Sequence, residues 1–129
     1  MNTEKIKEKY HYYKLEKEDV YKDTRGFVII TRSGIDKIQA IENIVINYDV
    51  INCEANFCVV KATANKGEAS IQTFGSALKG ESFKDGNTNT WYVMEMAEKR
   101  AMSRAVLKLT GFYELGVFGE DESEDFKRK

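Results

Sequence analysis

Hydrophobic and polar positions alternate through the middle of the chain, which predicts a sheet made of consecutive strands. Residues 44–50 have period two with one wetter face, and two further strand-like runs cover residues 53–64 and 69–74. Between the second and third runs, residues 65–67 (NKG) carry a turn signal, with a glycine free to take positive φ. Such short connections predict an antiparallel meander and not parallel strands joined by crossovers.

The helical pattern is clearest near the C-terminus. Residues 91–110 are dominated by good helix formers, with acids early and bases late, and Gly111 is a candidate C-cap. A short β-branched run at residues 27–30 predicts another strand. It leads into a short helix that Ser33 can cap, with isoleucines at i, i+3 and i+6.

The remaining segments carry weaker patterns. Residues 1–25 are charged and aromatic and fit a short helix, residues 75–89 read as a loop, and residues 114–129 form an acidic tail. The prediction is a single α+β domain over residues 26–113. In it, an antiparallel three- or four-stranded sheet packs against one long C-terminal helix.

Composition sets limits on the class of protein. The 129 residues are 42% hydrophobic and 32% charged, which suits one globular domain. No apolar run is long enough to span a membrane, and the charged start shows no signal peptide. Cys53 and Cys58 share one apolar stretch, where strand spacing would put them on opposite faces. We therefore expect reduced thiols and a cytoplasmic protein.

Catalytic sets are poorly represented. The chain has one histidine, His11, in its charged N-terminal segment, which argues against histidine-rich metal sites and histidine-based catalysis. Glu95 and Glu98 form a carboxylate pair without a histidine partner, and no phosphate-binding glycine motif is present. We expect no enzymatic activity, no cofactor and no metal.

Charge is unevenly distributed although the formal net charge is −1. From residue 114 onward there are six acids and three bases, whereas the first 113 residues carry a net charge of +2. This tail either keeps the protein in solution, competes with a ligand, or recruits a partner.

A cationic stripe is the best candidate site. Arg100, Arg104 and Lys108 follow each other at i, i+4 and i+8, beside Lys99. Like charges at this spacing cost about 0.2–0.5 kcal/mol per pair in an isolated helix, so carboxylates or an external polyanion should offset them. A phosphate backbone would do so, and a solvated helix face with nearby acids is the alternative.

Further residues could add to a nucleic-acid surface. Arg32 lies between a strand and a helix. Lys61, Lys66, Lys79 and Lys84 either add to the basic surface or are ordinary surface lysines. Tyr92 and Phe83 flank the loop and either stack on bases or pack in the core.

The order of three sequence pieces resembles the single-strand annealing proteins of the Rad-fifty-two superfamily, small phage recombinases included. The pieces are residues 27–38 (FVIITRSGIDKI), residues 73–77 (TFGSA) and residues 96–111 (MAEKRAMSRAVLKLTG), whose Ala-x-x-Arg-Ala pattern ends in glycine. The chain departs from the family in its short length, its acidic net charge and its lack of a second basic hairpin.

This resemblance implies a β-β-β-α core that assembles into rings or filaments. It also implies a basic groove that holds single-stranded DNA by its backbone for annealing in recombination or phage replication. Arg100, Arg104 and Lys108 would lie on the groove helix and Arg32 on its wall. Separately from the resemblance, the acidic tail either competes with DNA for the groove or recruits a single-strand binding protein or recombination partner. The alternative function is a small homo-oligomeric protein-interaction module that does not bind nucleic acid.

Overall fold

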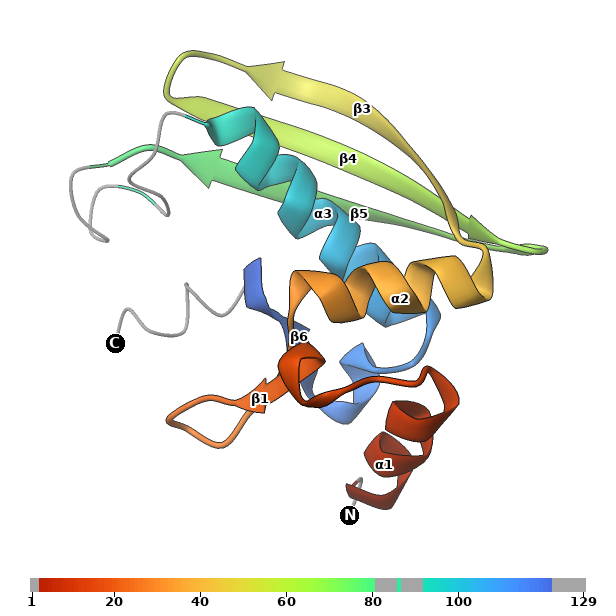
Figure 1. Cartoon of the computed structure of the whole chain (residues 1–129). Coiled ribbons are helices and arrows are strands. Elements are labelled where there is room, and N and C mark those ends of the chain that lie inside the picture. The colour runs from red at the N-terminus through yellow and green to blue at the C-terminus, as the bar shows by residue number, and fades with distance from the viewer. Residues whose placement is uncertain (1–2, 81–85, 87–91, 122–129) are drawn as a thin grey trace.

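A three-stranded antiparallel sheet forms one layer of the protein, and the long helix α3 packs across it (Figure 1). The computed structural model describes residues 3–80, 86 and 92–121. This sheet, called sheet B, has the order β3-β4-β5. Its elements are β3 (Val45–Cys53), β4 (Phe57–Lys66), β5 (Ala69–Leu78) and α3 (Val93–Leu109). The predicted meander and long helix are thereby confirmed.

A second three-stranded sheet, sheet A, was not anticipated. It has the order β1-β2-β6, from β1 (Val20–Lys22), β2 (Val28–Ile30) and β6 (Val117–Gly119). β2 pairs antiparallel with β1 and parallel with β6. The ordered core therefore extends past residue 113, into the segment expected to be an acidic tail.

Four shorter helical elements complete the described chain. They are α1 (Thr3–Tyr12), the 3-10 turn η1 (Lys17–Asp19), α2 (Arg32–Glu42) and the 3-10 turn η2 (Tyr113–Leu115). The N-cap of α2 is Thr31 and not Ser33, because the Thr31 hydroxyl accepts the Gly34 amide at 3.5 Å. Ser33 lies inside the first turn, where its hydroxyl donates to the Asp19 carboxylate at 2.5 Å.

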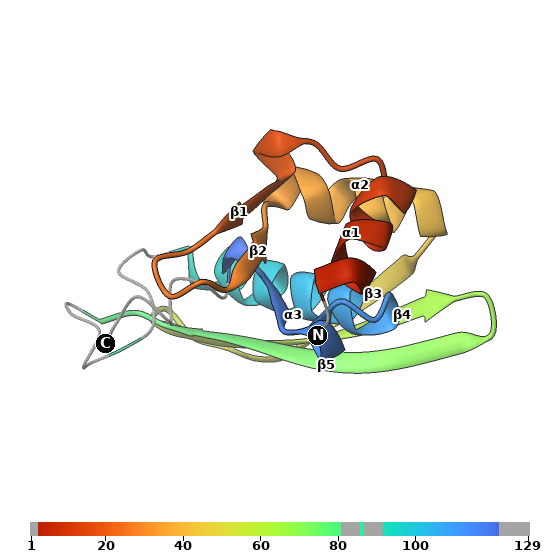
Figure 2. The same ribbon diagram turned by 90° about the horizontal axis from the view of Figure 1, so that it is seen from below.

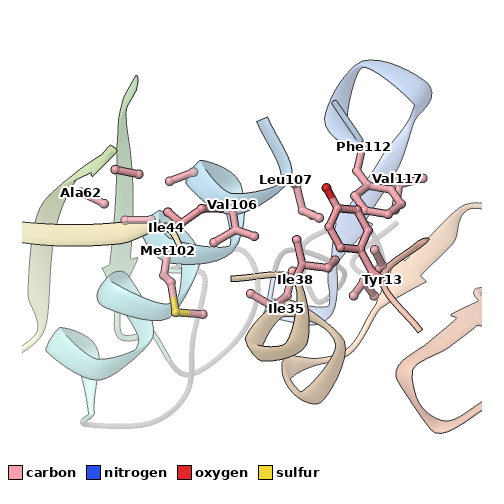
Figure 3. Packing of buried hydrophobic residues seen from close by; sticks show 14 of the residues in the cluster. Tyr13, Ile35, Ile38, Ile44, Ala62, Met102, Val106, Leu107, Phe112 and Val117 are labelled. Carbon is pink, nitrogen blue, oxygen red and sulfur yellow. The ribbon is translucent and has the colours of Figure 1, made fainter. Parts of the chain in front are cut away.

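The main hydrophobic core lies where α3 meets α2, sheet A and the N-terminal segment (Figure 3). Ile35, Ile38, Leu107 and Phe112 are among its fully buried members. Tyr13 and the adjacent turn also contribute to it, so the charged N-terminal segment belongs to the same single domain. The Tyr13 hydroxyl donates to Glu42 Oε2 at 2.5 Å, which ties this segment to the end of α2.

One face of sheet B lies under α3. The side chains on that face alternate with exposed ones and are mostly small; its buried members on β4 and β5 are Cys58, Val60, Ala62, Ala64, Thr73, Gly75 and Ala77. β5 continues to Leu78, so residues 75–78 are strand and not the expected loop, most of which lies outside the described residues. All described helices lie on the same side of sheet B, so no described element covers its other face, which is called the uncovered face below (Figure 2).

The two cysteines do not lie as the strand spacing suggested. They lie on neighbouring strands joined by a tight connection, and Cys53 is the register partner of Cys58. Partners in an antiparallel ladder point to the same face of the sheet. The expectation of opposite faces was therefore wrong, because it treated residues 53–64 as one strand. Both thiols are free in the structure.

Candidate nucleic-acid interface

Arg100 was expected on an exposed cationic stripe, and the structure buries it. It lies between α3, β5 and the segment after β6, with 2% of the residue exposed. Its Nη1 donates to the carbonyl oxygen of Ser76 at 2.8 Å and its Nε to that of Asp121 at 3.4 Å. This guanidinium therefore links the helix to a strand and to the C-terminal segment, and it is not available to a phosphate backbone.

Arg104, one turn later, makes the same kind of contact. Its Nη1 donates to the carbonyl oxygen of Phe74 at 2.8 Å. One helical turn matches the spacing of two residues along a strand, so the two arginines reach the alternate outward carbonyls of β5. These carbonyl dipoles offset the repulsion within the stripe. The contacts also occupy part of the outer edge of β5.

The two lysines of α3 do not take part in the contacts that Arg100 and Arg104 make with the carbonyls of β5. Lys99 is partly exposed, and Lys108 is exposed with its Nζ 5.3 Å from the centre of the Tyr113 ring. A cation over an aromatic face is a weak stabilising contact at such a site. Neither lysine joins the arginines in a continuous cationic surface.

Arg32 begins α2 and faces a mixed set of charges. Its Nε lies 3.4 Å from Asp36 Oδ1, and its backbone amide donates to Glu120 Oε1 at 2.7 Å. Its Nη1 is buried and has no hydrogen-bond partner among the described residues.

The pKa of Tyr48 on β3 depends on the charged side chains around it, which include Arg32. Burial and the charge of Glu98 raise the pKa of Tyr48, against the opposing effect of Arg32. Charges of both signs therefore act at this position, which weakens the region around Arg32 as a phosphate-binding surface.

Lys61 lies on the uncovered face of sheet B. Its register partner on β5 is Phe74, whose side chain is half exposed. The Lys61 ammonium lies 3.9 Å from the carboxylate of Asp49 on β3. Polar side chains surround this pair on the same face; they include Asn47, Thr63 and Gln72. An exposed aromatic ring beside a cation and hydrogen-bonding groups can stack a base and contact its phosphate.

Phe74 was missed as a candidate because the sequence placed it at the end of a strand. Its signal is the alternation in β5, where Thr73, Gly75 and Ala77 are small and buried and the residues between them are exposed. Of the two aromatics that were named, Tyr92 is exposed before α3, and Phe83 lies outside the described residues.

A cavity lies on the opposite side of the molecule from this face, between α1, β1 and β2. It has a volume of about 730 Å³ and an apolar floor that includes Ile6, Val20 and Leu115. Lys7, Lys17 and Lys22 line it, and none of the described residues that line it is acidic. This chemistry suits a ligand with both apolar and anionic groups. It adds nothing to the surface around Lys61.

The predicted cations are therefore divided among separate surfaces, and no set of them forms one groove. Among the described residues there is no cluster of three or more side chains that could hold a metal ion. In the same part of the chain, no helix is both long and apolar enough to cross a membrane. Comparison with protein-family models, curated proteins and solved structures found no match.

Proposed function

We propose that the chain binds single-stranded DNA without sequence specificity on the uncovered face of sheet B and thereby promotes annealing. The observation that supports this best is the cross-strand pair of Phe74 and Lys61 on a sheet face that no described element covers. Aromatic side chains on open sheets are a common platform for unpaired bases, because every base has a π-face.

The surface suits annealing in one further respect. A base stacked on the Phe74 ring keeps its Watson–Crick edge free to pair with a second strand. The reaction needs no covalent step, because two strands held on neighbouring copies meet at high local concentration. A role in recombination or phage replication rests on the family resemblance alone.

The test is fluorescence anisotropy of a labelled oligo-dT with the wild type and with single variants. Phe74→Ala should weaken binding roughly 5- to 150-fold, since stacking contributes about 1–3 kcal/mol per base. Tyr12→Ala is the matched control, because Tyr12 is an exposed aromatic on α1. Equal loss in both variants would contradict a stacking role for Phe74.

Arg32→Ala separates the two surfaces on which DNA could lie. If this variant loses binding and Phe74→Ala does not, DNA lies beside Arg32 at the start of α2, where the resemblance puts one wall of a binding groove. The absence of binding by folded wild type at low salt would contradict the function on either surface.

A second candidate function, a homo-oligomeric interaction module, is favoured by the edges of sheet B. All residues of β3 except Ile46 are exposed, and no described strand pairs with its outer edge. The β5 edge differs, because Arg100 and Arg104 occupy two of its carbonyls. Continuous addition of copies would need both edges, so the arrangement supports a two-fold dimer in which β3 pairs with β3.

A further inference from the structure

Cys53 and Cys58 are placed to react with each other. They are direct register partners at the closed end of the β3–β4 hairpin. Opposite residues in antiparallel strands have α-carbons about 4.5–5.5 Å apart. A disulfide requires about 4.4–6.8 Å, so the backbone of this hairpin already holds the two residues at a bonding separation.

The two thiols have different surroundings. Cys53 is exposed at the end of β3, whereas Cys58 is fully buried against Val93 and Ala97 of α3. Burial, contact with the Cys53 thiol and the charge of Glu95 raise the pKa of Cys58 to about 11. An external oxidant therefore reacts first with the exposed Cys53, and the buried Cys58 then reacts with the oxidised Cys53.

We propose that Cys53 and Cys58 form a reversible disulfide within one chain when the protein meets a small disulfide oxidant such as oxidised glutathione. The Cys53 thiolate attacks one glutathione sulfur, forms a mixed disulfide and releases one glutathione thiolate. Cys58 then loses its proton and attacks the Cys53 sulfur, which expels the second glutathione. The two protein thiols lose two electrons and two protons, and the oxidant becomes two molecules of glutathione.

The disulfide would hold the edge strand β3 against β4 at one end of sheet B. It closes a loop from residue 53 to residue 58 and joins the end of the edge strand β3 to the central strand β4. Closing a loop lowers the entropy of the unfolded chain, so the oxidised protein should be the more stable form. Excess reduced glutathione reverses the reaction. This inference is independent of DNA binding.

The experiment uses the full chain, folded in buffer and incubated with oxidised glutathione, then unfolded in acid urea and treated with a thiol-alkylating reagent. Intact mass spectrometry should show a monomer that has lost two hydrogen atoms and carries no alkyl groups. Its urea midpoint should rise and should return when the bond is reduced. Cys53→Ser is the control, because Cys53 is exposed and the substitution spares the core. That variant should show no change in urea midpoint.

Three outcomes would overturn the proposal. The first is full alkylation of both cysteines after exposure to the oxidant. The second is a stable mixed disulfide on Cys53 that never resolves. The third is a disulfide-linked dimer on a non-reducing gel in place of the internal bond.

Discussion

Gly75 on β5 lies directly against the backbone of α3 at Ala97. A β-carbon at Gly75 would lie 2.2 Å from the carbonyl oxygen of Ala97 and 2.6 Å from the amide nitrogen of Ala101. Two residues earlier along the strand, on the same face, the Thr73 hydroxyl donates to the carbonyl oxygen of Ala101 at 2.6 Å. The helix therefore packs on the strand through backbone atoms, and this close packing brings the two α3 arginines to the outer carbonyls of β5.

The close approach of Gly75 to α3 leaves no room for a side chain at this position. Gly75→Ala should destabilise the fold by about 2–3 kcal/mol, because the new methyl group meets helix backbone, which cannot move aside by changing a rotamer. Urea unfolding followed by circular dichroism measures the loss. Gln72→Ala, at an exposed position of the same strand, is the control and should change stability by less than about 0.5 kcal/mol. A Gly75→Ala variant as stable as this control would show that α3 can shift away from β5.

Arg100 should act on stability and not on DNA. Arg100→Met keeps much of the side-chain volume but leaves the carbonyls of Ser76 and Asp121 without this donor. The expected loss is about 1–3 kcal/mol of unfolding free energy. Oligo-dT affinity, corrected for the folded fraction, should stay at the wild-type value. A folded Arg100→Met protein that binds DNA much more weakly would place Arg100 in the interface after all.

The parts of the fold that follow local patterns were predictable. The β3–β5 meander, the α3 helix and the positive φ of Gly67 and Gly111 all follow from periodicity and turn chemistry. Sheet A was not predictable, because its strands are three residues long and β6 joins β2 from almost ninety residues away. Strands this short carry no periodic signal, and they form because tertiary packing brings them together.

The candidate site was predictable only in part, for a related reason. Helical spacing correctly puts Arg100 and Arg104 one turn apart. Whether that stripe faces solvent depends on which carbonyls of β5 lie beside it. The exposure of Phe74 depends in the same way on the uncovered face of sheet B. The exposure of the arginine stripe and of Phe74 depends on how α3 packs on sheet B, and neither can be read from the local sequence.

Asp19 makes the stability of the fold dependent on pH. Its carboxylate is buried and accepts Lys37 Nζ at 2.7 Å, the Ser33 hydroxyl at 2.5 Å and the Glu16 amide at 2.8 Å. Burial alone would raise the pKa of Asp19, but these hydrogen bonds and the Lys37 charge outweigh it and lower the pKa. The ionised carboxylate therefore stabilises the folded state at neutral pH. That contribution is lost as the pH falls below about 4, through the lowered pKa of the folded state.

Asp19→Asn tests this dependence. At pH 7 the variant should be less stable than the wild type by about 1–3 kcal/mol, because hydrogen bonds to a charged acceptor are replaced by weaker ones. The difference in urea midpoint should shrink as the pH is lowered from 7 to 3. Asp36→Asn removes a carboxylate from an exposed i, i+4 pair and should leave the profile unchanged. A constant gap between wild type and Asp19→Asn across this range would contradict the assignment.

The salt dependence of DNA binding should be shallow. Among the described residues of β3, β4 and β5 that face away from α3, Lys61 is the cation that can meet a phosphate, and it must first leave Asp49. With about one or two phosphate contacts, the slope of log K against log salt should lie near −0.7 to −1.4. Oligo-dT titrations at several salt concentrations measure it. Lys61→Ala should flatten the slope, and Lys7→Ala, on the other side of the molecule, should not. A slope near −3 would require the cations of several surfaces to act together.

The open edge of β3 predicts how copies of the chain associate. Val50 is half exposed on this edge, and a lysine there would oppose pairing with a second copy of β3 while leaving the monomer folded. We expect sedimentation velocity to show a concentration-dependent dimer for the wild type and a monomer for Val50→Lys. Gln72→Lys places the same charge on β5, where two carbonyls are already occupied, and should remain a dimer. If Gln72→Lys abolishes association and Val50→Lys does not, copies meet through β5 or through the uncovered face of sheet B. The contacts of Arg100 and Arg104 would then not prevent pairing at the β5 edge.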